Sequence, residues 1–310
     1  MSVRQTAENR AEAARPYEKM KRIGALLLVL LLVPVCAGAE LSVWFLDVGQ
    51  GDCTVVVCDG ESMIIDGGPA GSSQFVYSFI RDELGLDRLD YMISTHPHED
   101  HLPGLTAVLN AVPADLVLSP VLEWNTRRFE LFTEYAARQG APVVVPSVGD
   151  TMQLGGAAVT VLQCWPESVL WRENDVNDMS IVVRIDYGET SFIVTGDAEE
   201  TSEYMMIDSG VPLKADVLRV GHHGSTYSTS GEFLEAVSPR YAVISCGKGN
   251  GYGHPHGRVL NLLKKHRVWL FRTDLQGTVK CVSDGKELKF SVERWADKED
   301  LYTAPAWAGE

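Results

Sequence analysis

The chain has 310 residues, of which 45% are hydrophobic and 22% are charged, a composition that is ordinary for a folded globular protein. It excludes a disordered or fibrous chain, and the length allows one large α/β domain or two small ones. The formal net charge of −15 argues against the broad basic face of nucleic-acid-binding surfaces, although acidity can also serve only solubility.

Residues 1–39 are predicted to be a signal peptide. The stretch "MKRIGALLLVLLLVPVCAGAE" has a basic start, an apolar run over residues 23–35 and small residues before Glu40. That run is short for a membrane span, which needs about 20 residues. We therefore expect a periplasmic or secreted protein, with an uncleaved membrane anchor as the alternative and Met20 as an alternative start. Residues 1–39 hold six of the 27 basic and three of the 42 acidic residues. The remainder therefore has 21 basic and 39 acidic residues, which gives a formal charge of −18.

Apolar β-rich runs then alternate with helical patterns. "LSVWFLDVG" predicts a strand from Leu41, and "CTVVVCDGESMIIDGG" predicts a β-hairpin that ends at Asp66. Residues 73–84 have helical spacing, "DYMIST" indicates a buried strand, and a helix is expected from residue 102. Further strands are predicted at 115–118, 143–146, 158–163, 181–187, 191–195, 216–220, 241–245, 268–271, 278–282 and 287–292, and further helices at 127–138, 199–208, 230–237 and 257–265.

These elements predict one domain over residues 40–293, with a peripheral tail over residues 294–310. Strands 181–187 and 191–195, joined by "GET", must form a hairpin, so the sheets are mixed rather than purely parallel. The polar clusters around residues 96, 197 and 222 each follow the carboxyl end of a predicted strand. Because α/β proteins gather such strand-end loops at one crevice, we expect these clusters to converge.

The cysteines that follow the signal peptide are expected to be buried free thiols. Their odd number cannot pair completely, and their spacing resembles neither a disulfide framework nor a C-x-x-C zinc module. Cys53 and Cys58 lie on one predicted strand, roughly 16 Å apart, and cannot bond to each other. A single bridge among the other three remains an alternative. The five are Cys53, Cys58, Cys164, Cys246 and Cys281.

Seven of the eight histidines lie in three short segments, "HPHEDH", "GHHGS" and "GHPHG", which indicates a metal site. On a loop after a strand, His96 and His98 can face one point, while Asp100 and His101 face a second. Imidazole and carboxylate ligands suit zinc, manganese or iron, and two cations about 3.5–4 Å apart need a bridging carboxylate. Asp197 in "FIVTGDAEE" is the candidate bridge, and "GHHGS" supplies a further imidazole.

The pattern H-x-H-x-D-H, preceded by "DGG" and followed by "TGD" and "HHGS", resembles the metallo-β-lactamase superfamily over residues 41–293. Within it, "LDVGQGDCTVV", "NDMSIVVRIDYG", "LRVGHHGS" and "NGYGHPHGRVL" are similar to the hydrolase domain of ComEC-type competence proteins, here in a free-standing exported form without the channel helices. The resemblance implies a four-layer αβ/βα sandwich of two mixed β-sheets with helices outside. It also implies two divalent metal ions, zinc or manganese, and metal-assisted hydrolysis.

The resemblance also implies roles for individual residues. His96 and His98 would bind the first metal, Asp100 and His101 the second, and Asp197 would bridge them. One histidine of the "HHGS" pair would complete the second site, and the spacing leaves both open. The metal-ligand candidates are His96, His98, Asp100, His101, Asp197, His222 and His223; the catalytic candidates are Asp100 and His254; the substrate-binding candidates are Ser225, Ser228, His254 and His256; the supporting candidates are Asp52, Asp66, Asn177 and Asp178.

The sequence departs from the lactamases where a third histidine should complete the first site. The segment "ENDVNDMS" offers Asn177 and Asp178 instead, a departure that ComEC-like relatives share. It implies a weaker first site, filled only with substrate present, or filled by manganese rather than zinc. Two structural expectations follow: "GQGD" should turn on the same rim as His96, and Asp66 should be buried near His101, where it holds the histidine loop.

The leading functional interpretation is a phosphodiesterase, with DNA outside the cytoplasm as one substrate and Asp100 orienting the attacking water. No serine nucleophile is expected, because "GHHGS" lacks the G-x-S-x-G pattern. The alternatives are hydrolysis of a small phosphodiester, hydrolysis of a lactone or lactam, and a non-catalytic exported binding module. The alternative for His254 and His256 is a rigid turn made by Pro255. The oligomeric state is left open.

Overall fold

The computed structural model describes residues 40–165 and 176–305 of the chain. The predicted signal peptide, residues 1–39, lies outside these described residues. Within them, no helix has both the length and the apolar character needed to cross a membrane. The described residues from Glu40 onward form one compact unit built on two β-sheets.

The first sheet has eight strands and is mixed, as predicted. Antiparallel pairing joins its first five strands, and parallel pairing joins the last four, so β3 belongs to both parts. In spatial order the strands are β15 (Leu288–Val292), β14 (Val279–Ser283), β1 (Leu41–Phe45), β2 (Thr54–Cys58), β3 (Glu61–Ile65), β4 (Leu89–Ile93), β5 (Ala114–Leu118) and β6 (Val143–Val144).

The second sheet has seven strands and is also mixed. Its parallel part runs from β13 to β10, and its antiparallel part from β10 to β7. In spatial order the strands are β13 (Trp269–Arg272), β12 (Tyr241–Ile244), β11 (Val217–Arg219), β10 (Thr190–Val194), β9 (Val182–Tyr187), β8 (Ala157–Gln163) and β7 (Thr151–Leu154).

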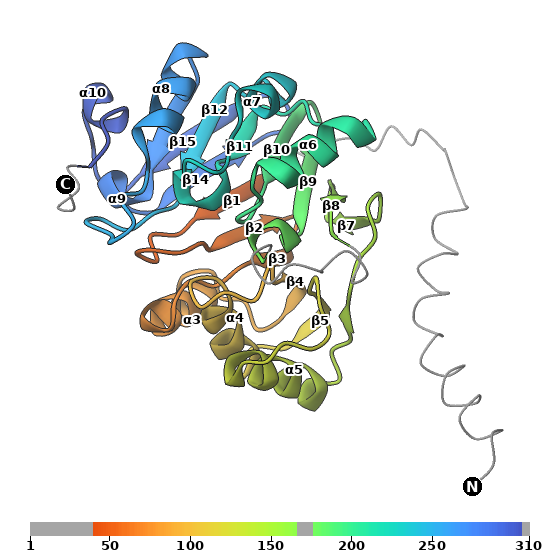
Figure 1. The fold of residues 1–310 in the computed structure, drawn as a ribbon. Helices are drawn as coiled ribbons and strands as arrows, with labels where there is room; N and C mark the ends of the chain where they lie inside the picture. Colours follow the sequence, from red (N-terminus) through yellow and green to blue (C-terminus); the bar gives the residue numbers. More distant parts are fainter. Residues whose placement is uncertain (1–39, 166–175, 306–310) are drawn as a thin grey trace, which may run out of the picture. The chain divides into compact units, whose positions relative to one another are not determined.

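Helices cover the outer face of each sheet, and three apolar cores separate the four layers. The central core joins the inner faces of the sheets, for example Phe45 to Phe192. The outer cores place α3, α4 and α5 on the first sheet and α6, α7 and α8 on the second (Figure 1). This architecture is the predicted four-layer αβ/βα sandwich. The helices are α3 (Ser73–Ser78), α4 (Leu102–Leu109), α5 (Arg127–Gln139), α6 (Glu200–Ser209), α7 (Gly231–Val237), α8 (Gly257–Lys265), α9 (Thr273–Gln276) and α10 (Lys298–Leu301).

Most predicted elements are confirmed within a residue or two, and the differences are local. The β2–β3 hairpin turns through Asp59 and Gly60, both with positive φ, as a two-residue turn of twisted strands requires. The helix predicted at 73–84 changes to a π-helix after Ser78, and the strand predicted at 143–146 is only Val143–Val144. Strand β7 was not predicted, because its alternation of exposed and buried residues is only four residues long.

The tail beyond residue 293 is held to the second sheet. Leu301 of α10 is buried in the outer core, and the buried Arg272 guanidinium at the end of β13 donates hydrogen bonds to the carbonyl oxygens of Leu301 and Thr303. The described part of the tail therefore packs as part of the domain. All five cysteines that follow residue 39 are buried and free, as predicted.

Candidate metal centre

The histidine loop, residues 94–101, begins where β4 ends and is held by Asp66 at the end of β3. Because β3 and β4 are parallel, their carboxyl ends meet at one edge of the sheet. Asp66 is fully buried, and its carboxylate accepts hydrogen bonds from Thr95 N (2.8 Å) and Thr95 Oγ1 (2.6 Å) at the start of the loop. Its Oδ2 lies 2.7 Å from Nδ1 of His101 at the loop's end. Asp66 is therefore buried beside His101, in the place that the sequence predicts.

Two glycines allow the backbone after Asp66 to touch the start of α4. Gly67 N donates to His101 O over 2.7 Å. A Cβ atom added at Gly104 would lie 1.7 Å from Gly67 O, and one added at Gly67 would lie 2.2 Å from Leu105 N. Both distances are far inside van der Waals contact, so only glycine fits at either position. This backbone contact fixes where the histidine loop enters the helix.

Asp197 lies at the centre of the converging histidines. It follows β10, which is parallel to β11 and so ends at the same edge as the "GHHGS" segment. One carboxylate oxygen of Asp197 faces the Nε2 atoms of four imidazoles. From Oδ2 the distances are 3.2 Å to His101, 3.4 Å to His223, 3.8 Å to His222 and 3.9 Å to His96. The predicted convergence of segments 96–101, 197 and 222–223 is therefore present.

Four residues form a compact group of ligand atoms: Asp100, His101, Asp197 and His223, whose ligand atoms all lie within 4.8 Å of one another. Asp100 Oδ2 is 3.3 Å from His223 Nε2. The Nε2 atoms of His101 and His223 are buried and have no hydrogen-bond partner, although they lie close to carboxylate oxygens. Unpaired buried nitrogens are costly unless something binds their lone pairs. This donor set fits a divalent cation such as zinc or manganese.

The outer nitrogens of these imidazoles are held by acceptors, which leaves Nε2 to face inward. Nδ1 of His101 contacts Asp66, and Nδ1 of His223 lies 2.9 Å from Ser245 O. Nδ1 of His222 lies 3.0 Å from Glu199 Oε1, at ion-pair distance but without hydrogen-bond alignment. Such outer contacts are typical of metal-binding histidines, because they fix the tautomer and the ring orientation.

His96 and His98 lie together beside this group. His96 Nε2 is 3.0 Å from His98 Nδ1, and the two ring centroids are 4.6 Å apart. Burial lowers the pKa of both rings, and the charge of His101 lowers it further. His222 Nε2 faces the same Asp197 oxygen as His96 Nε2, at 3.8 Å and 3.9 Å respectively. Ser180 Oγ, which accepts from Asp197 N, lies 3.4 Å from His96 Nδ1.

The electric field of the carboxylates dominates the centre. Burial alone would lower the pKa of His101, but Asp197 and Asp66 outweigh it and raise the pKa well above its ordinary value. Burial would likewise lower the pKa of His223, and Asp197 and Asp100 instead raise it to about 9. Burial would raise the pKa of Asp197, but the surrounding imidazoles hold it well below its usual range. Without metal, this pocket stabilises positive charge.

Arg219 is a site residue that the sequence analysis missed. It ends β11, is fully buried, and pairs through Nε with the equally buried Asp52 over 2.8 Å. Its guanidinium also donates to Gly196 O and lies 3.8 Å from Asp197 Oδ1, the oxygen that faces away from the imidazoles. Asp52 N donates to Asp100 O, so the "GQGD" segment lies on the rim of the histidine loop, as predicted. Arg219 thus connects this segment to Asp197.

Three of the residues predicted to bind substrate, Ser225, Ser228 and His256, make hydrogen bonds within or beside their own loops. Ser228 is fully buried, and its hydroxyl donates to Ala198 O over 2.9 Å, so the predicted substrate contact of Ser228 is replaced by a structural one. Ser225 is also buried, and its hydroxyl accepts from Tyr227 N. Nδ1 of His256 accepts from Thr226 N over 2.9 Å and so holds the same loop.

The ring of His254 lies closer to the centre. Its centroid is 5.5 Å from that of His222, 6.1 Å from that of His223 and 4.8 Å from that of His256. Burial and the charges of His223 and His222 lower its pKa to about 3, so this ring is neutral over the physiological range. His254 is therefore the substrate-loop candidate that lies against the proposed ligands.

Asn177 and Asp178 support the centre from behind. Asp178 accepts hydrogen bonds from Glu199 N, at the N-cap of α6, and from Ser202 N in its first turn. Asn177 Nδ2 donates to Glu199 Oε1, the oxygen that faces His222. These contacts connect both residues to the centre through Glu199.

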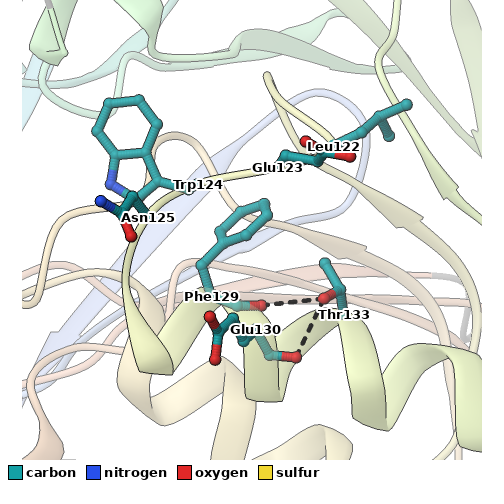
Figure 2. Close-up of a pocket in the computed structure, with 7 residues that line it drawn as sticks. All are labelled: Leu122, Glu123, Trp124, Asn125, Phe129, Glu130 and Thr133. Carbon is teal, nitrogen blue, oxygen red and sulfur yellow. Dashed lines mark hydrogen bonds between the residues drawn. The ribbon is translucent and has the colours of Figure 1, made fainter.

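A pocket of about 440 Å³ lies elsewhere, over α5 and the loop before it. Figure 2 shows the side chains of Trp124 and Phe129 at this pocket, and the Thr133 hydroxyl bonded to the carbonyl oxygens of Phe129 and Glu130. None of the residues that line it belongs to the predicted site. The chemistry of the molecule is therefore assigned to the histidine centre and not to this pocket.

Comparison with known proteins agrees with this geometry. The family model of the metallo-β-lactamase superfamily matches residues 46–169 and 174–248. ComE operon protein 3 of Bacillus subtilis is 31% identical over 292 residues, which cover 89% of this chain and 37% of that protein. Competence protein ComA of Neisseria gonorrhoeae is 32% identical over 243 residues, which cover 78% of this chain and 32% of that protein. The chain spans about a third of the length of these relatives.

Solved structures share the fold at low sequence identity. The metallo-β-lactamase fold protein YhfI of Bacillus subtilis has a TM-score of 0.50 at 12% identity, covering 78% of this chain and 99% of that one. CmlA, a diiron β-hydroxylase of Streptomyces venezuelae, has a TM-score of 0.51 at 17% identity, and the match covers 78% of this chain and 54% of that one. At such identities the likeness concerns the fold alone. The chain belongs to the metallo-β-lactamase superfamily, and the relatives it matches there are competence proteins of the ComEC type.

Proposed function

We propose that this protein is a metal-dependent phosphodiesterase that uses two divalent ions, zinc or manganese. The observation that carries the proposal is the single oxygen of Asp197, which lies 3.2–3.9 Å from the Nε2 atoms of four histidines. A carboxylate shared by so many imidazoles is suited to bridging two cations. Members of this superfamily are generally metal-dependent hydrolases, and the phosphodiester preference is our inference from the ComEC-like branch.

The ligands divide into two groups around Asp197. Asp100, His101 and His223 would hold one ion, since their ligand atoms cluster with those of Asp197. His96 and His98 would hold the other ion. The segment "ENDVNDMS" has no histidine to complete this second set, so His222 would supply the third imidazole. The bound ions would activate a water near neutral pH and polarise the scissile phosphoryl group.

Asp100 and His254 are the residues that we propose to act on the reacting groups. The Asp100 side chain is 31% exposed, whereas Asp197 is almost completely buried, so Asp100 is the cluster carboxylate that solvent reaches. It can orient the attacking water or hold its proton. His254, which is neutral, can donate or accept one hydrogen bond beside the leaving group.

A substrate outside the cytoplasm fits the predicted signal peptide, and DNA is the leading candidate. The acidic charge of the chain favours a substrate that is held by the metal centre rather than by a basic surface. The alternatives are a small phosphodiester, a lactone or lactam, and a binding module without activity.

The test is to incubate metal-loaded protein with bis-p-nitrophenyl phosphate, single-stranded DNA and nitrocefin. We expect turnover of the phosphodiesters and none of the lactam. Asp100→Ala should abolish turnover, while Asp208→Ala, at an exposed position of α6, is the matched control. Equal rates for wild type and Asp100→Ala would overturn the proposed site, and turnover of nitrocefin alone would overturn the substrate class.

A further inference from the structure

An exposed aromatic side chain lies beside the proposed site, in ring contact with His254. Tyr252 is 63% exposed, on the loop between β12 and α8 that also carries His254. What distinguishes Tyr252 from other exposed aromatic side chains, such as Tyr204, is that its ring stacks on His254 beside the proposed ligands. Because β12 is parallel to β11, this loop leaves the same sheet edge as the "GHHGS" segment.

The ring of Tyr252 continues a row of rings that leads to the proposed ligands. It stacks on His254 with centroids 5.6 Å apart and planes at 22°. His254 is in turn 5.5 Å from the ring of His222, so the Tyr252 ring lies at most about 11 Å from that ligand. A nucleotide whose phosphate sits at the metal centre can therefore reach Tyr252 with its base.

The loop holds Tyr252 in place before any substrate arrives. Asn250 Oδ1 accepts hydrogen bonds from Tyr252 N (3.1 Å) and His254 N (3.0 Å). Asn250 Nδ2 donates to the carbonyl oxygens of Gly247 and His254. His254 covers one face of the tyrosine ring, and the large exposed fraction leaves surface for a second ring. A preorganised aromatic platform loses little entropy when it binds.

The acidic charge of the chain favours binding of a nucleic acid through its bases rather than through its phosphate backbone. The net charge of −15 argues against a broad basic surface of the kind that tracks a nucleic-acid backbone. Stacking on an aromatic side chain instead binds the base itself, and it requires a base that is not paired in a duplex. We propose that Tyr252 is a nucleobase-stacking subsite, which directs this enzyme to single-stranded nucleic acid. This inference rests on the proposed phosphodiesterase function.

The test compares short oligo(dT) with an abasic oligonucleotide of the same length and backbone. Binding is measured by fluorescence anisotropy in the Asp100→Ala background, and hydrolysis in the otherwise native enzyme. We expect Tyr252→Ala to weaken oligo(dT) binding about 5- to 100-fold and to raise KM more than it lowers kcat. Binding of the abasic strand should not change. Tyr252→Phe should keep the preference for bases, and Tyr204→Ala, at another exposed tyrosine, is the matched control.

Two results would overturn the subsite. One is equal affinity of wild type for oligo(dT) and the abasic strand, and the other is an unchanged preference in Tyr252→Ala. Tighter binding of duplex than of single strands would overturn the single-strand preference. Failure to hydrolyse any phosphodiester would overturn the proposed function, whereas the binding comparison reports on Tyr252 independently of turnover.

Discussion

The buried pair of Asp52 and Arg219 allows a quantitative prediction. Both side chains are fully buried, their closest atoms are 2.8 Å apart, and the Asp52 carboxylate has no hydrogen-bond partner among the described residues. Arg219→Met would leave a carboxylate buried without its counter-charge, a change that costs about 3–5 kcal/mol. For a domain of this size that is a fall in Tm of roughly 10 °C. Urea unfolding followed by circular dichroism measures the free-energy loss.

The double variant Asp52→Asn, Arg219→Met separates the charge effect from lost packing. Because it removes both charges, we expect it to be more stable than Arg219→Met alone, with a coupling energy of at least 1 kcal/mol between the two positions. A loss below about 1 kcal/mol in the single variant would refute the reasoning. So would a double variant that is no more stable than the Arg219 variant.

Three further predictions concern the loops and the metal centre. Burial raises the pKa of Glu203 from 4.5 to about 7, so the ionised carboxylate lowers the stability of the folded state more as pH rises between these values. Glu203→Gln should therefore remove up to about 3 kcal/mol of the difference in unfolding free energy between pH 4.5 and pH 8, measured in unfolding titrations at both values. Gly104→Ala should lower Tm sharply, because its Cβ would overlap Gly67 O, whereas Gly71→Ala, with open space around it, should not. Removing metal with a chelator should lower the Tm of the native protein, and His266→Ala, which alters the one histidine outside the three clusters, should show the same drop.

The sequence predicted the convergence of the centre because its signals are local. Histidines and acids that directly follow apolar strands must lie at strand ends, and the edge they share follows from parallel pairing. The choice between His222 and His223 could not be predicted in this way. Both have positive φ, 47° and 55°, so neither side-chain direction follows from strand alternation. Only the folded loop shows that both face Asp197.

Arg219 and Ser228 escaped correct prediction for a different reason. In "LRVG" an arginine is most simply a solvated residue on a strand, because a fully buried arginine is rare without a partner. Its partner Asp52 is 167 positions away in the chain, and no local pattern joins the two. Ser228 on a glycine-rich loop suggested a phosphate contact, yet its hydroxyl is used by the nearby Ala198 carbonyl.

The contact between Gly67 and Gly104 makes the position of the histidine loop independent of the side chains around it. Two stretches of main chain touch there with only hydrogen atoms between them, so no rotamer change can loosen the joint. Substitutions of neighbouring side chains can therefore occur without moving the end of the histidine loop, which the main chain itself holds. New specificities in such a scaffold would arise on the outer rim, while any substitution at the two glycines would weaken the fold.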